Sequence, residues 1–534
     1  MTGFLSICRQ CAGAAGLVLL LAACSGRYSV EGEDGGDVFD AADREGLPDA
    51  ADLPDSADAD LEDADMDDPP DLIIDAPGDT ADAAGDTGHE EEPPDPTASV
   101  PRIHPDDPHR FIRNGETWYP AGYYPGAAFN MTTPDYGGDY TLYNESFIDR
   151  IAENNINYFR IWINWGALSS GDTWDAHILP PYERTGPGTA ADGGPRLDLD
   201  RFSEEYFAVI EHAVEYAADR DIVVQVMILD CWHAGFGRSY GFDELDFFAG
   251  PNNVSGVSFS SEAEWFDVGG TVYAHNIAFA QQVVARIGDN TNIVWETCNE
   301  KKPGDHSTPA ATASDPFHAG IAEAIRAKES ELGLPAHLVM PVDLPEHRTV
   351  AGHRTPTNGA PDQESIDAMH ERMTGEQYSW NVILITDNDC CLGEPDAAFL
   401  RRKAWAALTA GAHIDAFNNE LCYASVLASA NTADGMRWIG ATRSFVDDFG
   451  IDLAGMVPSD GLVSSGAWAL ARPGEEYIIY ADAGTAQVTV EGLAGGHDAW
   501  WFDPRAGGTR EAGAGPTFET PDGSDWVLYI KSGP

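Results

Sequence analysis

The chain has 534 residues, a formal net charge of −59, and hydrophobic and aromatic contents of 43% and 10%. It is too long for one ordinary domain, so we expect two folded units plus non-globular sequence. Phosphate binding requires Lys and Arg side chains that displace counterions, so this charge argues against nucleic acid as a partner. It also disfavours adhesion to anionic lipid.

The first residues resemble a bacterial lipoprotein signal. Arg9 precedes an apolar run over 12–21, and the small residues Ala22 and Ala23 lead to Cys24. The run is too short to span a bilayer core of roughly 30 Å, which needs about 20 apolar residues, so we expect a cleaved export signal at 1–23. Cys24 would then carry a lipid anchor on the extracellular side of a bacterial membrane, as in an outer-membrane lipoprotein. An ordinary cleaved signal with an incidental Cys24 is the alternative.

Residues 24–100 are expected to form a disordered acidic linker behind this anchor. Between residues 28 and 101 there are 26 Asp and Glu side chains against one base, Arg44, and almost no aromatic side chains. Such a segment buries too little apolar surface to offset the entropy of ordering it. Its like charges repel one another, so we interpret it as an extended spacer.

Five cysteines remain beyond the expected anchor, at positions 231, 298, 390, 391 and 422. An odd number excludes full pairing within the chain, and the spacing matches neither a zinc site nor a disulfide-dense scaffold. Cys390 and Cys391 could pair with distant partners in an oxidising compartment. Buried free thiols are the alternative.

Residues 101–455 alternate between short apolar runs and amphipathic stretches, a pattern typical of repeated βα units. Eight strands with intervening helices favour a (β/α)8 barrel, with an open doubly wound sheet as the alternative. No Gly-x-Gly-x-x-Gly sequence follows an early strand, so the usual nucleotide fingerprint is absent. The expected strands are 118–123, 158–162, 222–229, 292–298, 337–340, 365–370, 382–386 and 412–417, and the expected helices include 144–154, 203–220, 274–287, 316–333 and 396–411.

Residues 456–534 lose the helical periodicity. Alternating segments at 476–480, 486–490, 498–502 and 526–531 are bounded by Gly, Pro and Asp. We therefore expect a small antiparallel β domain, a sandwich, at the end of the chain.

The fourth strand ends in acidic residues, which is unusual for a buried parallel strand. It carries Glu296 inside the apolar run and Asn299-Glu300 at its tip. Burying a carboxyl group costs several kcal/mol unless it is paired or protonated, so these residues are candidates for catalysis. The alternative is that Glu300 is an exposed loop carboxylate and that Glu296 is a satisfied structural one.

A second carboxylate source follows the seventh strand. If the reaction is cleavage of a glycosidic bond, one carboxylic acid must protonate the departing oxygen and another carboxylate must attack or activate water. Asp387 and Asp389 follow that strand in Asp387-Asn388-Asp389, although this sequence is also good turn chemistry. Carboxyl groups roughly 5 Å apart would retain the anomeric configuration, and a separation of about 6.5–9.5 Å would invert it.

With its Asn299-Glu300 tip, this strand resembles the acid/base strand of the large clan of (β/α)8 retaining glycoside hydrolases that includes the cellulases. The resemblance implies that Glu300 is the acid/base and that Asn299 binds the sugar 2-hydroxyl. Arg160, in Tyr158-Phe159-Arg160-Ile161-Trp162, matches the arginine that holds the clan's nucleophile ionised. An interior salt bridge is the alternative for Arg160.

Within the clan, the chain is most similar to the apiosidase-like, cellulase-related barrels that precede a domain named for collagen binding. The segments that carry this resemblance are 401–405 (Arg-Arg-Lys-Ala-Trp), 411–413 (Gly-Ala-His), 501–507 (Trp-Phe-Asp-Pro-Arg-Ala-Gly) and 526–528 (Trp-Val-Leu). One departure matters, because the clan's nucleophile is normally Glu and this chain offers Asp387 and Asp389. We rank Asp387 first and Asp389 second, with loss of the nucleophile as the third possibility.

Aromatic and histidine side chains near the expected strand ends are candidates for sugar binding. The aromatic rings could stack on apolar sugar faces, and the histidines could donate to hydroxyls, although aromatic residues in a barrel more often form the core. No pair of His residues has the spacing of a helical zinc site, so we expect no metal and no cofactor. The candidates are Tyr123, Tyr124, Trp162, Trp165, Trp232, His233 and His370.

Taken together, the sequence predicts a surface-tethered glycoside hydrolase that acts on poly- or oligosaccharides through Glu300 and Asp387. Two alternatives stay open. The barrel could bind surface glycans without turnover, or the C-terminal domain could make the protein an adhesin.

Overall fold

The computed structural model describes residues 97–124, 128–168, 177–234, 244–299, 301, 311, 313–343, 363–386, 397–417, 430–493 and 495–533. The expected signal, the anchor at Cys24 and most of the expected linker lie outside the described residues. In the part of the chain that is described, none of the helices has the length and apolar character needed to cross a membrane.

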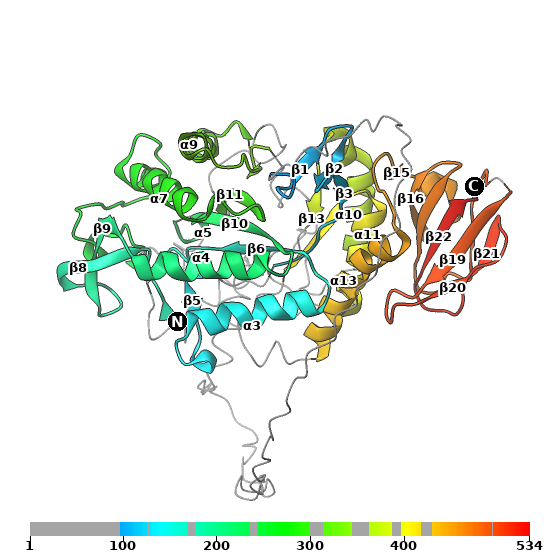
Figure 1. The fold of residues 1–534 in the computed structure, drawn as a ribbon, viewed down its shortest axis with the longest axis horizontal. Helices are drawn as coiled ribbons and strands as arrows, with labels where there is room; N and C mark the ends of the chain where they lie inside the picture. The colour runs from blue at the N-terminus through cyan, green and yellow to red at the C-terminus, as the bar shows by residue number, and fades with distance from the viewer. Residues whose placement is uncertain are drawn as a thin grey trace, which may run out of the picture. The chain divides into compact units, whose positions relative to one another are not determined.

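A curled parallel sheet forms the centre of the larger folded part (Figure 1). Its seven described strands run in the order β12-β11-β10-β6-β4-β14-β13, and each neighbouring pair is parallel. The first of these strands along the chain, β4, pairs with the last, β14, as in a (β/α)8 barrel, and β12 and β13 are the edge strands of the described sheet. The fold is therefore the predicted (β/α)8 barrel, and the open doubly wound sheet is wrong. The strands are β4 (Ala121–Tyr124), β6 (Tyr158–Trp162), β10 (Val223–Asp230), β11 (Ile293–Asn299), β12 (Val339–Met340), β13 (Ile385–Thr386) and β14 (His413–Phe417).

Amphipathic helices accompany the strands (Figure 1). Side chains that accept a backbone N–H start several of them, such as Ser203 before α4 and Asp315 before α9. In α4 the residues at three- and four-residue spacing, from Tyr206 to Ala217, are buried. The helices are α3 (Tyr140–Glu153), α4 (Glu204–Ala218), α7 (Thr271–Ile287), α9 (Pro316–Leu332), α10 (Gln363–Arg372), α11 (Ala397–Thr409) and α13 (Ala430–Phe449).

Two expected strands are wrong in detail. The strand expected at 365–370 is helix α10, because its apolar residues Ile366, Met369 and the following Met373 are spaced three and four apart and form one buried helical face. The strand expected at 118–123 is split between β3, which ends at Trp118, and β4, which begins at Ala121. Pro120 lies between them and has no N–H to donate to a strand ladder.

The barrel interior is built in layers that follow the two-residue alternation of its strands. The floor is apolar: Phe111 packs with inward-facing Tyr158, Val223, Val294, Met340, Ile383 and Ile385. Two residues further along three of these strands stand Arg160, Gln225 and Glu296, all buried. The layer above the floor is therefore polar on this side.

Shorter elements close the floor and lengthen the loops. Three antiparallel strands precede the barrel, and the β8–β9 hairpin follows β6 in the chain. The hairpin contacts the segment after β10, where Arg196 Nη2 donates to the Gly250 carbonyl over 2.6 Å. These elements are β1 (Arg102–His104), β2 (Asp107–Arg113), β3 (Glu116–Trp118), β5 (Met131–Thr132), β7 (His177–Ile178), β8 (Tyr182–Thr189), β9 (Pro195–Phe202), α5 (Cys231–Ala234) and α6 (Glu262–Trp265).

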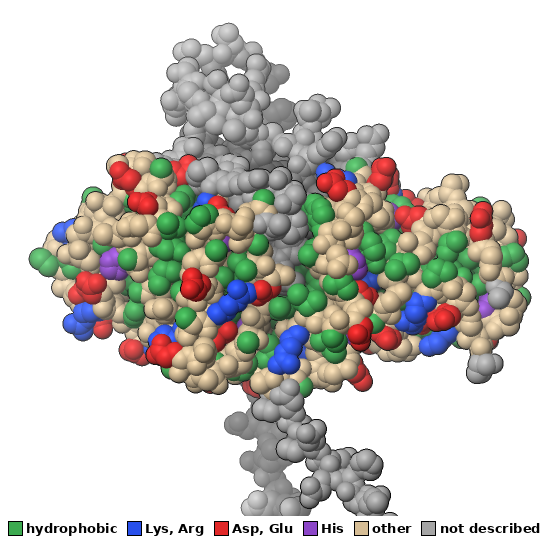
Figure 2. All heavy atoms as spheres, turned by 90° about the horizontal axis from the view of Figure 1, so that it is seen from above, with side chains coloured by type: hydrophobic (Ala, Val, Ile, Leu, Met, Phe, Trp, Pro, Cys, Tyr) green, Lys and Arg blue, Asp and Glu red, His purple; other side chains and the backbone are tan. Residues whose placement is uncertain are grey.

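The surface charges of the body are mixed in sign. On the face shown in Figure 2, Lys and Arg side chains lie among Asp and Glu side chains, with hydrophobic groups between them. This face therefore offers no gathered basic surface.

The C-terminal part is an all-β region, as predicted. Six antiparallel strands run in the order β15-β16-β17-β22-β19-β20, and β18 and β21 form a second, two-stranded sheet. One face of the larger sheet packs on Val488, Val490 and Phe518, which builds the core of the region itself. The strands are β15 (Val457–Pro458), β16 (Ala467–Arg472), β17 (Glu476–Ala481), β18 (Gln487–Thr489), β19 (His497–Phe502), β20 (Thr509–Glu511), β21 (Thr517–Glu519) and β22 (Trp526–Ser532).

The other face of this sheet packs on the barrel. Its inward members belong to the same hydrophobic cluster as the barrel helices: Leu470, Ile478, Tyr480, Phe502, Val527 and Tyr529. Tyr480 stacks on Trp405 of α11 with ring centroids 6.3 Å apart, and Tyr529 lies 4.6 Å from Phe449 of α13. Because alternate residues of one sheet serve two cores, the barrel and the β region share a continuous hydrophobic interior.

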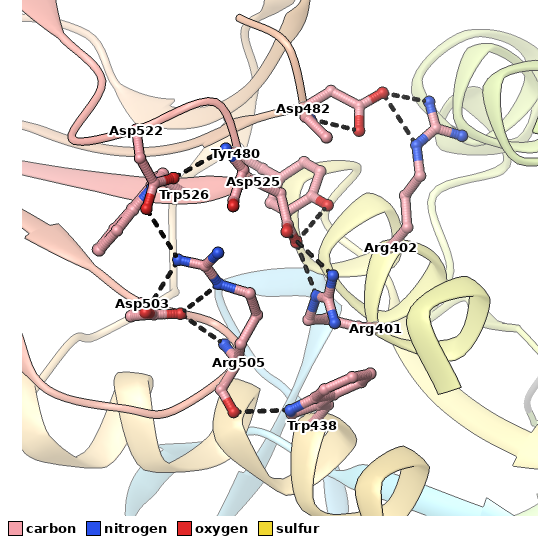
Figure 3. Close-up of polar contacts among 12 residues, drawn as sticks. Arg401, Arg402, Trp438, Tyr480, Asp482, Asp503, Arg505, Asp522, Asp525 and Trp526 are labelled. Atoms are coloured by element: carbon pink, nitrogen blue, oxygen red, sulfur yellow. Dashed lines mark hydrogen bonds and ion pairs between the residues drawn. The ribbon is translucent and has the colours of Figure 1, made fainter. Parts of the chain in front are cut away.

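Ion pairs reinforce this interface (Figure 3). Arg401 of α11 makes a two-pronged contact with Asp525, with distances of 2.7 and 3.0 Å, and Tyr480 donates to the same carboxylate over 2.9 Å. The Nε and Nη2 atoms of the neighbouring Arg402 both donate to Asp482 Oδ2, with distances of 3.0 and 2.7 Å. These side chains satisfy carboxylates that the packed interface would otherwise isolate from water.

Replacing Arg401 by Met should therefore destabilise the whole chain. Asp525 is 3% exposed and would lose its cation, and breaking a buried pair from one side costs about 3–5 kcal/mol. Arg437→Met is the matched control, because the Arg437–Asp434 pair is half exposed and worth about 1 kcal/mol or less. Urea unfolding of both variants measures the difference, and equal losses would contradict the proposed weight of the Arg401 contact.

Candidate active site

Arg160 organises the mouth end of the barrel interior. From β6 it reaches β11, where its Nε lies 2.7 Å from Glu296 Oε2 and its Nη2 lies 2.5 Å from Glu296 Oε1. The same Nη2 donates to Asn299 Oδ1 over 3.0 Å. The Arg160 and Glu296 side chains are only 1% and 4% exposed, so this is a two-pronged ion pair largely removed from water.

The contact with Arg160 fixes the orientation of the Asn299 amide. A guanidinium only donates hydrogen bonds, so the oxygen of Asn299 must face Arg160 and the NH2 group must lie at the other branch of the amide. Asn299 is the last residue of β11, at the carboxyl end of the strand, where reactive groups of such barrels are found. The side chain therefore presents a hydrogen-bond donor at the strand end.

A second tier of side chains supports Glu296. Gln225 Nε2 on β10 donates to Glu296 Oε2 over 2.6 Å, and the Tyr158 hydroxyl donates to the Gln225 carbonyl oxygen. Burial, together with the nearby carboxylates of Asp415 and Glu296, holds the pKa of Tyr158 well above its ordinary value. Tyr158 therefore stays protonated and donates to Gln225, and Gln225 donates to Glu296. Arg160 donates to the same carboxylate from another strand, so hydrogen bonds converge on Glu296 from both sides. Glu296 is the satisfied structural carboxylate that the sequence allowed as an alternative.

A disulfide ties the ends of two neighbouring strands. Cys231, directly after β10, is bonded to Cys298 on β11, with Cα atoms 5.7 Å apart and both residues buried. This settles one pairing that the sequence left open. Cys390, Cys391 and Cys422 lie outside the described residues.

Aromatic rings line the same end of β4 and β6. Tyr124 lies under the Arg160 guanidinium at 5.0 Å, and Trp162 packs edge-on against Tyr124 and Trp165. Among the residues that the structure describes, the buried indole N–H of Trp162 has no hydrogen-bond partner. In the described part of the chain, the Trp162 indole N–H is therefore an unused hydrogen-bond donor near Arg160. Tyr123 points to the opposite face of β4 from Tyr124 and is buried in the core, and its place in the sugar site stays a prediction.

Helix α5 carries the other two candidates from this side of the barrel. His233 is fully buried and its Nδ1 pairs with the Asp230 carboxylate. Its ring packs edge-on against Trp165 at 4.8 Å. Trp232 is half-buried, and its backbone N–H donates to Asp230 Oδ1 over 3.1 Å. Through Trp165, these residues adjoin the Trp162 and Tyr124 rings.

His370 is not part of this group. It lies on α10, where its ring nitrogens contact the Ala406 carbonyl and Asp460 Oδ2, each over 2.9 Å, and its ring stacks on Trp468 of the β region. The prediction placed His370 at a strand end because a strand was expected at 365–370. The helix instead places it in the interface with the β region, so its predicted contact with substrate is wrong.

The acidic candidates follow the strands in the expected order. β11 ends at Asn299, directly before Glu300, and β13 ends at Thr386, directly before Asp387. Glu300, Asp387 and Asp389 themselves lie outside the described residues. In the described part of the chain, no group of three or more His, Cys, Asp or Glu side chains is placed to hold a metal ion.

Several buried polar residues near this site were not among the predicted ones. Gln225 and Asp415 interrupt apolar strand runs, which is the same signal that singled out Glu296. Asp246 gave no such signal, because it lies in the long segment after β10 and its burial follows from tertiary packing. Its carboxylate accepts from the Phe248 N–H over 2.7 Å and from Trp265 Nε1 over 3.2 Å.

Burial raises the pKa of Asp246 to about 7, although the Phe248 N–H, His233 and Trp265 act in the opposite direction. Between pH 4 and 7 the folded protein therefore holds a proton that the unfolded chain has released, so this group's contribution to stability falls as pH rises through that window. Asp246→Asn should remove up to about 1.4 kcal/mol of this fall per pH unit. Urea unfolding at pH 5, 6 and 7 measures it. Asp200→Asn, at an exposed carboxylate, should follow the wild-type protein, and a parallel pH profile for Asp246→Asn would contradict the assignment.

Comparisons with known proteins bear on this arrangement. Residues 120–370 match the sequence model of the cellulase family, glycosyl hydrolase family 5. A solved glycoside hydrolase is 12% identical with a TM-score of 0.52, and the match covers 82% of this chain and 97% of that chain. A family 5 glycoside hydrolase from Bacteroides vulgatus is also 12% identical, with a TM-score of 0.51 and coverage of 82% and 93%. A comparison with curated proteins found no match.

Proposed function

We propose that the barrel, in which residues 120–370 match the cellulase family model, cleaves O-glycosidic bonds of poly- or oligosaccharides with retention, using Glu300 as acid/base and Asp387 as nucleophile. The observation that carries the proposal is the Arg160–Asn299 contact at the end of β11, directly before Glu300. This contact orients the NH2 group of Asn299, and Asn299 directly precedes Glu300 in the sequence.

The proposed chemistry has two steps. Glu300 protonates the departing glycosidic oxygen while a carboxylate oxygen of Asp387 bonds to the anomeric carbon. Water then attacks this glycosyl ester, and Glu300 takes the proton from the water, which returns both carboxyl groups to their starting state. The NH2 group of Asn299 would bind the sugar 2-hydroxyl, and the Trp162 and Tyr124 side chains would line the sugar site.

Substitution of the three acids tests these roles. Glu300→Gln should lower sugar release from a polysaccharide panel by about 10²–10⁴-fold, because general acid catalysis contributes that much. Asp387→Asn should abolish release and Asp389→Asn should preserve most of it, and NMR of the first product should show the starting anomer. If Asp389→Asn alone abolishes release, the nucleophile is Asp389.

The second candidate function is glycan binding without turnover. Asp in place of the family's usual Glu after the seventh strand is the observation that favours it. Saturable binding of an oligosaccharide together with no sugar release from the wild-type protein would establish this function instead. An adhesin acting through the β region has less support, because both faces of the larger sheet are already packed in hydrophobic cores.

Export and lipid attachment form the last part of the proposal. The Cys231–Cys298 disulfide supports passage into an oxidising compartment, since such bonds are rare in the bacterial cytosol. The sequence before Cys24 supports attachment there, and the acidic residues up to about 100 would hold the barrel away from an outer membrane.

Cys24→Ser should remove the anchor without altering the fold. In cells fed a labelled fatty acid, the wild-type chain should carry the label in the membrane fraction, and the variant should lose the label and leave that fraction. Cys231→Ser serves as the control, because it changes another cysteine and should keep the label. A labelled Cys24→Ser chain would contradict attachment at this residue.

A further inference from the structure

The residues around position 300 are held by side chains from several elements. Thr297 Oγ1 lies 2.6 Å from His318 Nδ1 on α9, and Cys298 is bonded to Cys231 on α5. Asn299 is held by Arg160 of β6. On its amino side, Glu300 therefore follows three consecutive residues that are each tied to a different part of the barrel.

Lys301 provides the attachment on the carboxyl side. Its Nζ lies 2.9 Å from Asp315 Oδ2, and the two side chains are 6% and 14% exposed. The rings of Phe266 and Phe317 lie 5.2 and 5.9 Å from the ammonium group, which shields the pair from water. A long, flexible side chain is thus held in one place by a charged partner and two aromatic rings.

Asp315 is a rigid partner for Lys301. Its Oδ1 accepts the Phe317 N–H over 2.9 Å, which makes it the N-cap of the 17-residue helix α9. Burial acts to raise the pKa of Asp315, but the hydrogen bonds from Lys301 and from the Phe317 N–H outweigh it and lower the pKa. Asp315 is therefore ionised, and it balances a cation that stands one residue from the proposed acid.

We propose that Lys301 and Asp315 are positioning residues for Glu300. The pair holds the residue after Glu300 as Arg160 holds the residue before it. Two fixed neighbours would limit the positions open to the Glu300 carboxyl group, and so the distance at which it meets the departing oxygen. This inference rests on the proposed role of Glu300 as acid/base. A structural ion pair without this role would contribute to stability alone.

The leaving group separates these two roles. A phenolate leaving group needs its proton from the acid, whereas 2,4-dinitrophenolate is stable enough to leave without it. Misplacing the acid should therefore slow cleavage of a phenyl glycoside and spare the 2,4-dinitrophenyl glycoside of the same sugar. A general loss of fold or of sugar binding would slow both.

The experiment measures kcat/KM for these two glycosides of the sugar that the wild-type chain releases from the polysaccharide panel. We expect Lys301→Met to lower kcat/KM for the phenyl glycoside on the order of 10- to 100-fold, as for a displacement of about 1 Å, and to change the dinitrophenyl value less than about threefold. Lys301→Arg should recover most of the loss. Lys328→Met, which removes the Lys328–Glu331 pair on α9, should change neither value.

Asp315→Asn covers the case in which Lys301→Met does not fold, because Asn keeps the helix cap and removes the charge. It should show the same dependence on the leaving group. If Glu300→Gln shows this dependence and both the Lys301 and Asp315 variants slow the two glycosides equally, the positioning role is overturned while Glu300 keeps its role. If Glu300→Gln also slows both equally, or if no sugar is released by the wild-type chain, the proposed function fails and this inference fails with it.

Discussion

The buried pair of Arg160 and Glu296 is the interaction on which the mouth of the barrel depends. A charged guanidinium inside a barrel is tolerated only if its donors are used, and here Glu296 accepts two of them and Asn299 another. Two apolar side chains of similar volume would often give equal or greater stability at such a position, so stability alone does not account for the pair. What the pair adds is orientation, because an amide that faces a guanidinium has one possible direction. Gln225, in the same layer, and Tyr158, in the floor, extend this constraint toward the base of the barrel.

Alternating side chains of one sheet join the two folded parts, because successive residues of a strand face opposite sides. Along β17, Ile479 faces the core of the β region, whereas Ile478 and Tyr480 face the barrel helices. The β region is therefore one wall of the barrel's helical shell, and α11 is held by strands on its inner side and by a sheet on its outer side. Both faces of the larger sheet therefore contribute to hydrophobic cores, one with the barrel helices and one within the β region. It also means that removing the β region would expose the aromatic side of α11 and α13.

The sequence predicted most of the barrel because its buried strands are short apolar runs that few other structures accommodate. The predicted runs at 158–162, 222–229 and 292–298 lie within one residue of β6, β10 and β11. The prediction failed at 365–370, where a short segment with Ile366 and Met369 fits a strand or a helix, and three-residue spacing should have decided for the helix. The predicted position of His370 at a strand end was wrong for the same reason. Tyr123 and Tyr124 illustrate a different limit, because adjacent residues of a strand face opposite sides and composition cannot say which side is the interior. The Asp246–Trp265 contact and the Lys301–Asp315 pair join residues 19 and 14 positions apart, a spacing that the local patterns of helices and strands do not contain.

The two sides of the proposed reaction are supported unequally. On the acid/base side, Thr297, Cys298, Asn299 and Lys301 are each held by a partner, so the end of β11 has little freedom to adjust. Asp387 or Asp389 is one methylene shorter than the Glu that related enzymes use, and the reaction requires two carboxyl groups at a fixed separation across the sugar. If β11 cannot move, the missing length must be supplied by the chain that follows Thr386 or by the sugar's own position. If Asp387 or Asp389 acts as the nucleophile, as proposed, its short side chain would restrict which sugars and linkages fit, and substrate shape would be the property that this site selects.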